Sequence, residues 1–188
     1  MKKLKELRTM LTLADVKASV ILRKLIVVSL AEIFKDILPG YKIRPWTEKE
    51  SQQNVSKEVQ QLRDYEETLL KQYKLYLDYL NESIRVNYRL IFSARKNGEK
   101  PISESDKSSL ISLNVILVRC LCKFLQRLSQ FNFANEIIEW LVEQLTSTVP
   151  DVILIFEILN SILATKKTNK IIFLSDLIAR HRHIQNDF

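Results

Sequence analysis

The stretch from Val55 to Ile91 carries one apolar face that repeats every 3.6 residues, the period of an α-helix. Ten steps of this period span the 36 positions, whereas a coiled coil would repeat every 3.5. We therefore predict a long helix over residues 55–95, packed against a core along one side, with a bend near Asn81–Ser83, where Asn81 could cap a new helix. The face consists of Val59, Leu62, Glu66, Leu69, Tyr73, Leu77, Leu80, Ile84, Tyr88 and Ile91.

Glycine and proline are scarce, with two Gly and four Pro in 188 residues. All-β folds need many of both in their turns, so the chain is predicted to be all-α. An apolar helix is expected from a cap at Asp15 to about Leu38. Its polar residues form only a narrow stripe, so it should be packed on most sides. A surface loop at 97–106, ending in a Ser103-x-x-Asp106 capping box, should separate this half from the next.

Four further helices are predicted after the loop, over residues 106–130, 133–147, 150–165 and 169–183. Helices of this length that pair at intervals of about 40 residues are typical of HEAT and armadillo arrays. We therefore predict a HEAT/armadillo-like helical repeat array (an α-solenoid segment) with one long helix in its first half. The expected organisation is a basic helical region at 1–96, the loop, and a helical-repeat region at 107–188. Together they would form one continuous domain of a longer protein.

The segment Phe34–Glu50, FKDILPGYKIRPWTEKE, joins the apolar helix to the long charged one. Pro39-Gly40 should end the first helix, because proline disfavours the α conformation before it and glycine permits a positive φ. Tyr41–Trp46 should then be extended. The pattern of Thr47–Glu50 is a capping box, which predicts that the next helix starts near Glu48.

Two roles are open for the extended part of this joint. In a structural role, Tyr41, Ile43 and Pro45 pack on the helices, and Lys42 and Arg44 face out or pair with acids. In a binding role, basic and aromatic residues together contact phosphate and stack a base of RNA. The first is favoured. Candidate RNA contacts are Lys42 and Arg44 here, with Arg85 and Arg89 as a second basic strip.

Glu66 lies within the apolar face of the long helix, where a carboxylate needs a partner. Arg63, one turn earlier, is the expected partner. The alternative is that the apolar face opens to solvent at this point.

The net charge of +7 comes from the first half of the chain. Residues 1–100 hold 20 Lys and Arg against 13 Asp and Glu, while residues 101–188 are balanced. Such an excess is typical of a protein with an acidic partner, for example RNA phosphate or an acidic protein tail. The competing interpretation is that lysine and glutamate merely solvate long helices.

No pattern in the chain indicates catalysis. Cys120 and Cys122 are expected to be buried reduced thiols, and His181 and His183 do not share a helix face. Two glycines are too few for a phosphate-binding loop. The most apolar segment is interrupted by charges and is too short to span a bilayer. We therefore predict a non-enzymatic protein with no catalytic residues, cofactor, metal, small-molecule substrate or membrane partner.

The joint resembles the nucleolar complex protein 3 family. There, a hydrophobic helix ends in a phrase close to FKDI-x-PGY-x-IR, which matches Phe34–Ile37, Pro39–Tyr41 and Ile43-Arg44. The following helix matches too, at Ser56–Val59, Leu62-Arg63, Glu66, Leu70 and Tyr73. The likeness covers about residues 1–80. Pro45-Trp46 departs from the family pattern, and no family phrase is evident beyond residue 98. The signature residues are Phe34, Asp36, Pro39, Gly40, Tyr41, Ile43, Arg63 and Glu66.

The resemblance implies a helical-repeat protein of the nucleolus, within the nucleus. Such proteins work with nucleolar complex protein 2 and other assembly factors in the maturation and export of large ribosomal subunit precursors. The expected function is therefore a scaffold in ribosome biogenesis that docks protein partners and contacts ribosomal RNA weakly. The alternative that the resemblance also allows is a helical adaptor in chromatin binding and DNA replication initiation.

Overall fold

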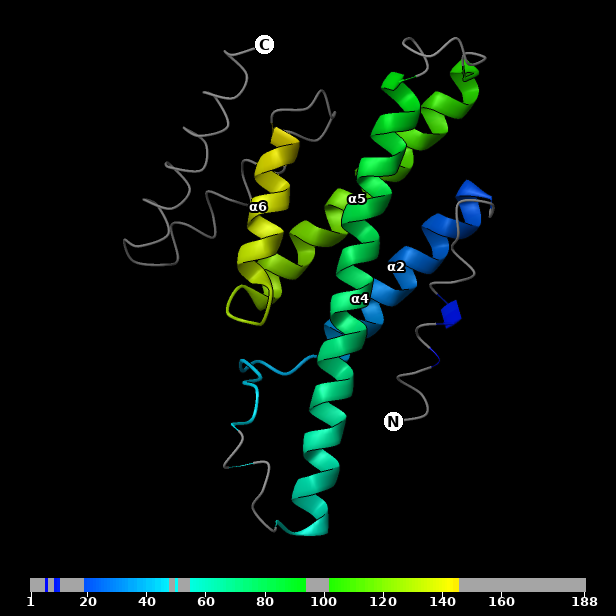
Figure 1. Cartoon of the computed structure of the whole chain (residues 1–188). Coiled ribbons are helices and arrows are strands. Elements are labelled where there is room, and N and C mark those ends of the chain that lie inside the picture. The colour runs from blue at the N-terminus through cyan, green and yellow to red at the C-terminus, as the bar shows by residue number, and fades with distance from the viewer. Residues whose placement is uncertain are drawn as a thin grey trace. The chain divides into compact units, whose positions relative to one another are not determined.

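Figure 1 shows a computed structural model of the chain, which describes residues 6, 9–10, 19–47, 50, 55–93 and 102–145. Within these ranges the regular elements are four helices, and no strand occurs. They are α2 (Val20–Ile37), α4 (Lys57–Ser93), α5 (Glu104–Leu128) and α6 (Ala134–Leu145). The prediction of an all-α protein is thus confirmed for the described residues. The expected helices 150–165 and 169–183 lie outside them, and the repeat array stays a prediction.

The chain forms two compact units. The first comprises Met1–Tyr79 with Gln130–Asn132, and the second comprises Leu80–Ser129 with Phe133–Phe188. Helix α4 contributes residues to both. The domain boundaries expected from the sequence, 1–96 and 107–188, remain a prediction.

Helix α2 begins at Val20, later than expected, because Ser19 is its N-cap and accepts a hydrogen bond from the Leu22 amide at 3.3 Å. The predicted cap, Asp15, lies outside the described residues. The expectation that this helix is packed on most sides is wrong. Ile21 is 80% exposed and Leu25 63% exposed, and Leu22 and Val28 also face solvent. Only the opposite side, which includes Val27, Leu30 and Phe34, is buried.

The core of the first unit is built around aromatic rings. The Phe34 ring of α2 lies 5.2 Å from the Tyr76 ring and 5.6 Å from the Tyr73 ring, measured between centroids. Phe131 extends the cluster, with its centroid 5.7 Å from that of Tyr73. The buried Tyr76 hydroxyl donates to the Val27 carbonyl at 2.9 Å. Burial of the Tyr73 ring raises the pKa of the Tyr73 phenol.

Helix α4 runs without interruption for 37 residues, about 55 Å at a rise of ~1.5 Å per residue. The prediction that Asn81 caps a new helix is wrong: Asn81 is buried within the continuous helix, and Leu80 and Ile84 near it are core residues. Packing here outweighs a local preference for a cap. Leu69, Tyr73 and Leu77 are buried as the 3.6-residue period requires.

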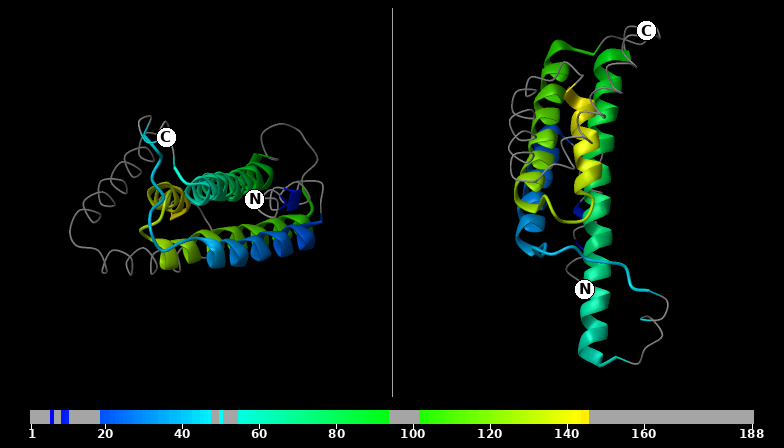
Figure 2. Two further views of the ribbon diagram at one scale, coloured as in Figure 1. Left: turned by 90° about the horizontal axis from the view of Figure 1, so that it is seen from below. Right: turned by 90° about the vertical axis from the view of Figure 1, so that its left-hand side faces the viewer.

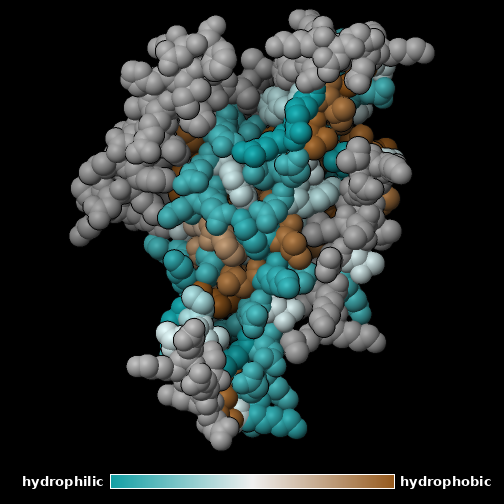
Figure 3. All heavy atoms as spheres, in the orientation of Figure 1, coloured by the Kyte–Doolittle hydropathy of each residue, from teal (hydrophilic) through white to brown (hydrophobic). Residues whose placement is uncertain are grey.

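In the first turns of α4, the apolar positions of the 3.6-residue period are not buried. Val59 and Leu62 are 40% and 54% exposed, so the apolar face opens to solvent before it reaches the core. Polar side chains dominate this part of the helix, and the lower end of α4 is mainly hydrophilic in Figure 3.

In the second unit, α5 and α6 pack against each other, as the views of Figure 2 show. Ser103 caps α5 by accepting from the Asp106 amide at 3.1 Å, which confirms the predicted capping box. Cys120 and Cys122 are buried thiols not joined in a disulfide, as expected. Asn87 of α4 donates a hydrogen bond from Nδ2 to Oδ1 of Asn114 in α5 at 2.7 Å. The buried core residues include Leu113, Leu117, Leu121 and Leu125 of α5 and Ile137, Ile138, Leu141 and Val142 of α6.

Among the described helices, α5 alone is long and apolar enough to cross a membrane by length and composition. The core helix of a soluble protein passes the same test, and half of its most apolar window is buried inside the protein. Its second half also carries Arg119, Lys123 and Arg127, and cations are costly at the centre of a bilayer. These features favour a core helix.

Candidate functional site

The family-signature joint begins where α2 ends. Leu38 has the extended backbone (φ −73°, ψ 131°) that a following proline favours, while its amide still donates to the Phe34 carbonyl at 3.0 Å. Gly40 does not use the positive φ that glycine permits, since its φ lies outside the left-handed region. A Cβ at this position would meet no atom within 4 Å. Pro39 therefore ends the helix without help from a left-handed glycine.

Replacing Gly40 with alanine should be harmless. We expect Gly40→Ala to leave the free energy of unfolding unchanged or raise it by up to about 1 kcal/mol, because alanine restricts the unfolded chain. Urea unfolding followed by circular dichroism measures this. A loss of more than about 1 kcal/mol would contradict the open space and ordinary backbone found at this position.

Ile43 anchors the extended part of the joint. Tyr41, Ile43 and Pro45 were predicted to pack on the helices. Of these three, Ile43 is buried, whereas Tyr41 and Pro45 are exposed. The side chain of Asn132 holds its backbone at two points. Asn132 Oδ1 accepts from the Ile43 amide at 3.0 Å, and Asn132 Nδ2 donates to the Ile43 carbonyl at 2.7 Å. This amide group satisfies both backbone groups of Ile43, as a neighbouring strand would.

Tyr41 fastens the joint to α4 through a polar contact. Its hydroxyl donates to Glu66 Oε1 at 2.5 Å, which raises the pKa of the Tyr41 phenol because the neutral phenol is the donor. The predicted pairing of Glu66 with Arg63 is therefore wrong. Glu66 is bonded to a residue 25 positions away instead of one turn away.

Glu50 organises the end of the joint. Its carboxylate accepts from the Thr47 amide at 3.0 Å and from two nitrogens of the Arg44 guanidinium at 2.6 and 3.0 Å. The Arg44 hydrogen bonds, followed by that from the Thr47 amide, lower the pKa of Glu50 to about 2. The Glu50 amide in turn donates to Thr47 Oγ1 at 3.4 Å, which confirms the predicted capping box. The long helix nevertheless starts only at Lys57.

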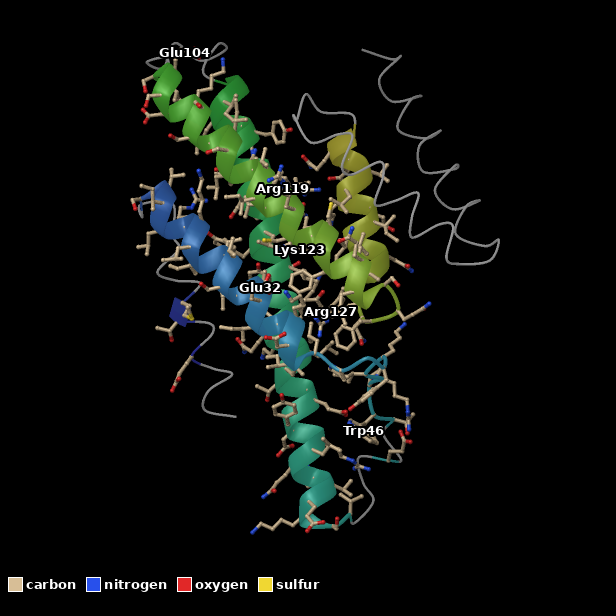
Figure 4. All side chains as sticks on the ribbon, turned by 180° about the vertical axis from the view of Figure 1, so that it is seen from behind. Glu32, Trp46, Glu104, Arg119, Lys123 and Arg127 are labelled. Atoms are coloured by element: carbon tan, nitrogen blue, oxygen red, sulfur yellow. The ribbon has the colours of Figure 1, made fainter. Side chains whose placement is uncertain are left out.

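The Trp46 ring contacts two guanidinium groups (Trp46 is labelled in Figure 4). The Arg63 carbon Cζ is 4.0 Å from the ring centroid and that of Arg44 is 5.4 Å away, both within cation–π range. Arg63 also donates to the Glu50 carbonyl at 3.0 Å. The departure from the family pattern at Pro45-Trp46 thus has a local structural explanation, since the indole packs on arginines that hold the joint.

Tyr41, Ile43, Arg63 and Glu66 of the family signature meet at this joint, together with Arg44, which is one of the four candidate RNA contacts. Phe34 lies in the aromatic core, while Asp36 is exposed. Besides the pair of Arg44 with Glu50, Arg85 binds Glu143 at 3.1 Å and Arg89 binds Glu82 at 2.8 Å. Lys42 is exposed, and within the described part of the chain no hydrogen bond or ion pair involves it. Three of the four candidates are thus already bound to carboxylates, and RNA contact by these residues stays a prediction.

Asn132 and the contact between Trp46 and Arg63 were not anticipated from the sequence. Asn132 is 89 residues from its partner, and nothing in a short polar joint between two helices marks a side chain that will bond a distant backbone. Over the ranges described above, no group of three or more His, Cys, Asp or Glu residues could hold a metal ion. The contacts around this joint are structural: they hold two helices and the extended segment in place.

The comparisons with known proteins lead to one family. The family model for the nucleolar complex-associated protein matches residues 1–76. The nucleolar complex protein 3 homologue of Danio rerio is 45% identical over 141 residues, which is 75% of this chain. The human homologue is 43% identical over 147 residues, again 75% of the chain. The nucleolar complex-associated protein 3 of Saccharomyces cerevisiae is 30% identical over 154 residues, 80% of the chain.

The chain belongs to the nucleolar complex protein 3 family. It spans 17% of the length of the zebrafish and human relatives and 21% of the yeast one. Because 141 aligned residues cannot fit into the first 98, the likeness continues into the second half, where the sequence shows no family phrase. Membership indicates a nucleolar, and hence nuclear, location, and none of the relatives' names denotes an enzyme.

Proposed function

We propose that this chain is part of a non-enzymatic scaffold in ribosome biogenesis, which assembles large ribosomal subunit precursors and helps to export them together with nucleolar complex protein 2. Membership of the nucleolar complex protein 3 family supports a role in the nucleolus. The joint supports a structural role, because its polar groups bond to one another and leave no constellation for chemistry. A helical-repeat arrangement would suit such a role, since arrays leave long surfaces for partners.

The observation that carries the proposal is the exposed apolar row on α2, formed by Ile21, Leu25 and Val28. These residues are spaced i, i+4, i+7 and so share one face of the helix. An apolar row at this spacing fits the complementary face of a partner helix laid alongside it. We assign this face to a helix of nucleolar complex protein 2, with other assembly factors and RNA joining elsewhere.

Double substitution of the α2 row tests this assignment in the full-length protein. We expect Ile21→Glu with Leu25→Glu to reduce co-purification of nucleolar complex protein 2 by tenfold or more, because each charge would be buried at the contact. Val59→Glu with Leu62→Glu is the matched control. It places two glutamates at exposed apolar positions of α4 in the same unit and should leave co-purification intact.

Two results would reject parts of the proposal. Unchanged co-purification of the α2 variant would remove the row as the docking surface. Association of the wild-type protein with chromatin, and never with pre-ribosomal particles, would replace the scaffold function with the adaptor role in DNA replication.

A further inference from the structure

Arg23 is the only charged residue on the buried face of α2. It precedes Val27, Leu30 and Phe34 at helical spacing, and these three apolar side chains are at most 1% exposed. Arg23 itself is only 3% exposed. Arginines often bury their aliphatic stem and keep the guanidinium in water, but the Arg23 Nε atom, which belongs to the guanidinium, is buried. The charged group of Arg23 is therefore largely removed from solvent.

This guanidinium has no partner in the part of the chain that the structure describes. Its Nε atom makes no hydrogen bond there, and no ion pair involves Arg23. Its own helix offers no nearby acid, because the first one in α2 is Glu32, nine residues later. An arginine is a permanent cation, and a buried charge without a partner is strongly unfavourable. Arg23 is therefore expected to meet an anion from outside these residues.

The first turn of α2 adds further hydrogen-bond donors at the same end of the helix. Ser19 Oγ accepts from the Leu22 amide at 3.3 Å, and the Ser19 carbonyl accepts from the Arg23 amide at 3.0 Å. The Val20 and Ile21 amides have no acceptor within the helix, as in the first turn of any helix. No acidic residue occurs in this turn. Long helical side chains lean towards the N-terminus of their helix, which brings the Arg23 guanidinium towards these two amides.

We infer that Arg23 and the first turn of α2 bind a carboxylate side chain, supplied by a protein segment that packs against this end of the helix. A carboxylate accepts two parallel hydrogen bonds from one guanidinium. The positive end of the helix dipole favours a negative charge at the same place. The bound carboxylate neutralises a buried charge that no described residue pairs.

The surroundings of the site favour a protein carboxylate over the phosphates of a nucleic acid. Ile21 is 80% exposed and Leu22 is 43% exposed, so the first turn has an apolar rim. An aspartate or glutamate can reach the guanidinium while apolar neighbours from its own segment cover this rim, as in the core of a protein interface. A nucleic-acid backbone carries a charge at every phosphate and would lay further charges over apolar side chains.

Thermal unfolding of the chain in sodium acetate and in sodium chloride of equal ionic strength tests the inference. Acetate is the probe because it presents a single carboxylate. A ligand that binds only the folded state raises the unfolding temperature, and we expect the wild type to unfold about 2 °C higher in about 0.2 M acetate than in chloride. Arg23→Met should remove this difference. In chloride it should also unfold at a higher temperature than the wild type, because methionine fills similar space without an unpaired charge.

Arg127→Met is the matched control. Arg127 is exposed in the last turn of α5, so its substitution should change neither the unfolding temperature in chloride nor the response to acetate. A wild type that does not respond to acetate would overturn the inference, whether or not the Arg23 variant folds. Equal responses of the wild type and Arg23→Met would overturn it too. An Arg23-dependent response to inorganic phosphate that exceeds the response to acetate would reject the carboxylate in favour of a phosphate ligand.

The same substitution in the full-length protein, purified alone, identifies the source of the carboxylate. If another part of the same protein supplies it, Arg23→Met breaks a buried ion pair and lowers the unfolding temperature. If a partner supplies it, the substitution raises the unfolding temperature, as in the chain itself. None of these measurements involves nucleolar complex protein 2, so the proposed function is judged separately.

Discussion

Phe34→Ala is expected to lower the free energy of unfolding by about 3–5 kcal/mol, the usual cost of emptying a fully buried phenylalanine site. Phe34 is 1% exposed and its ring contacts both Tyr73 and Tyr76, so the substitution removes two aromatic pairs as well as the buried area. Urea unfolding followed by far-ultraviolet circular dichroism measures the change as a shift of the transition midpoint.

Phe34→Leu keeps this experiment informative if the alanine variant does not fold. Leucine fills much of the same volume, so its cost should stay below that of alanine and near 1.5 kcal/mol. If Phe34→Ala shifts the stability by less than about 1 kcal/mol, the aromatic cluster is not the core of the first unit.

Asn132→Ala is expected to cost about 2 kcal/mol, although Asn132 is only partly buried. The substitution leaves the amide and carbonyl of Ile43 without the partner they have at 3.0 and 2.7 Å, and Ile43 is 5% exposed. A buried polar group that loses its partner costs about 1–3 kcal/mol. The same unfolding measurement applies. Hydrogen exchange at the Ile43 amide should also become faster.

Asn135→Ala is the matched control for this substitution. Asn135 lies three residues further on, at the exposed start of α6, so its removal should change stability by no more than about 0.5 kcal/mol. Asn132→Asp separates the two bonds, because aspartate can accept from the Ile43 amide but cannot donate to its carbonyl. Equal stabilities for Asn132→Ala and Asn135→Ala would mean that the two-point contact does not hold the joint.

Local patterns predicted the helices well because helix formation depends on neighbours a few residues apart. The 3.6-residue period of α4, the capping boxes at Thr47 and Ser103 and the end of α2 before Pro39 were all recognisable. Local preference failed where packing decided the outcome. Asn81 could cap a helix, yet α4 continues through it because the residues around it are buried.

The joint shows the same division at the level of a site. Its ends and its extended backbone follow from proline, threonine and glutamate within a few residues of each other. Its attachments do not, because Tyr41 bonds Glu66 and Ile43 bonds Asn132 across 25 and 89 residues. Arg44 illustrates the consequence for function. A basic residue that looks available for phosphate is already bound to Glu50.

By itself the sequence determined that the chain is helical, where most helices begin and end, and which family it resembles, since short-range periodicity and a distinctive phrase suffice for these. Only the tertiary structure decided which side of α2 is open, what holds the joint, and that Arg85 and Arg89 are paired with glutamates. Those properties depend on residues distant in sequence that meet in space, and no local pattern encodes such a meeting.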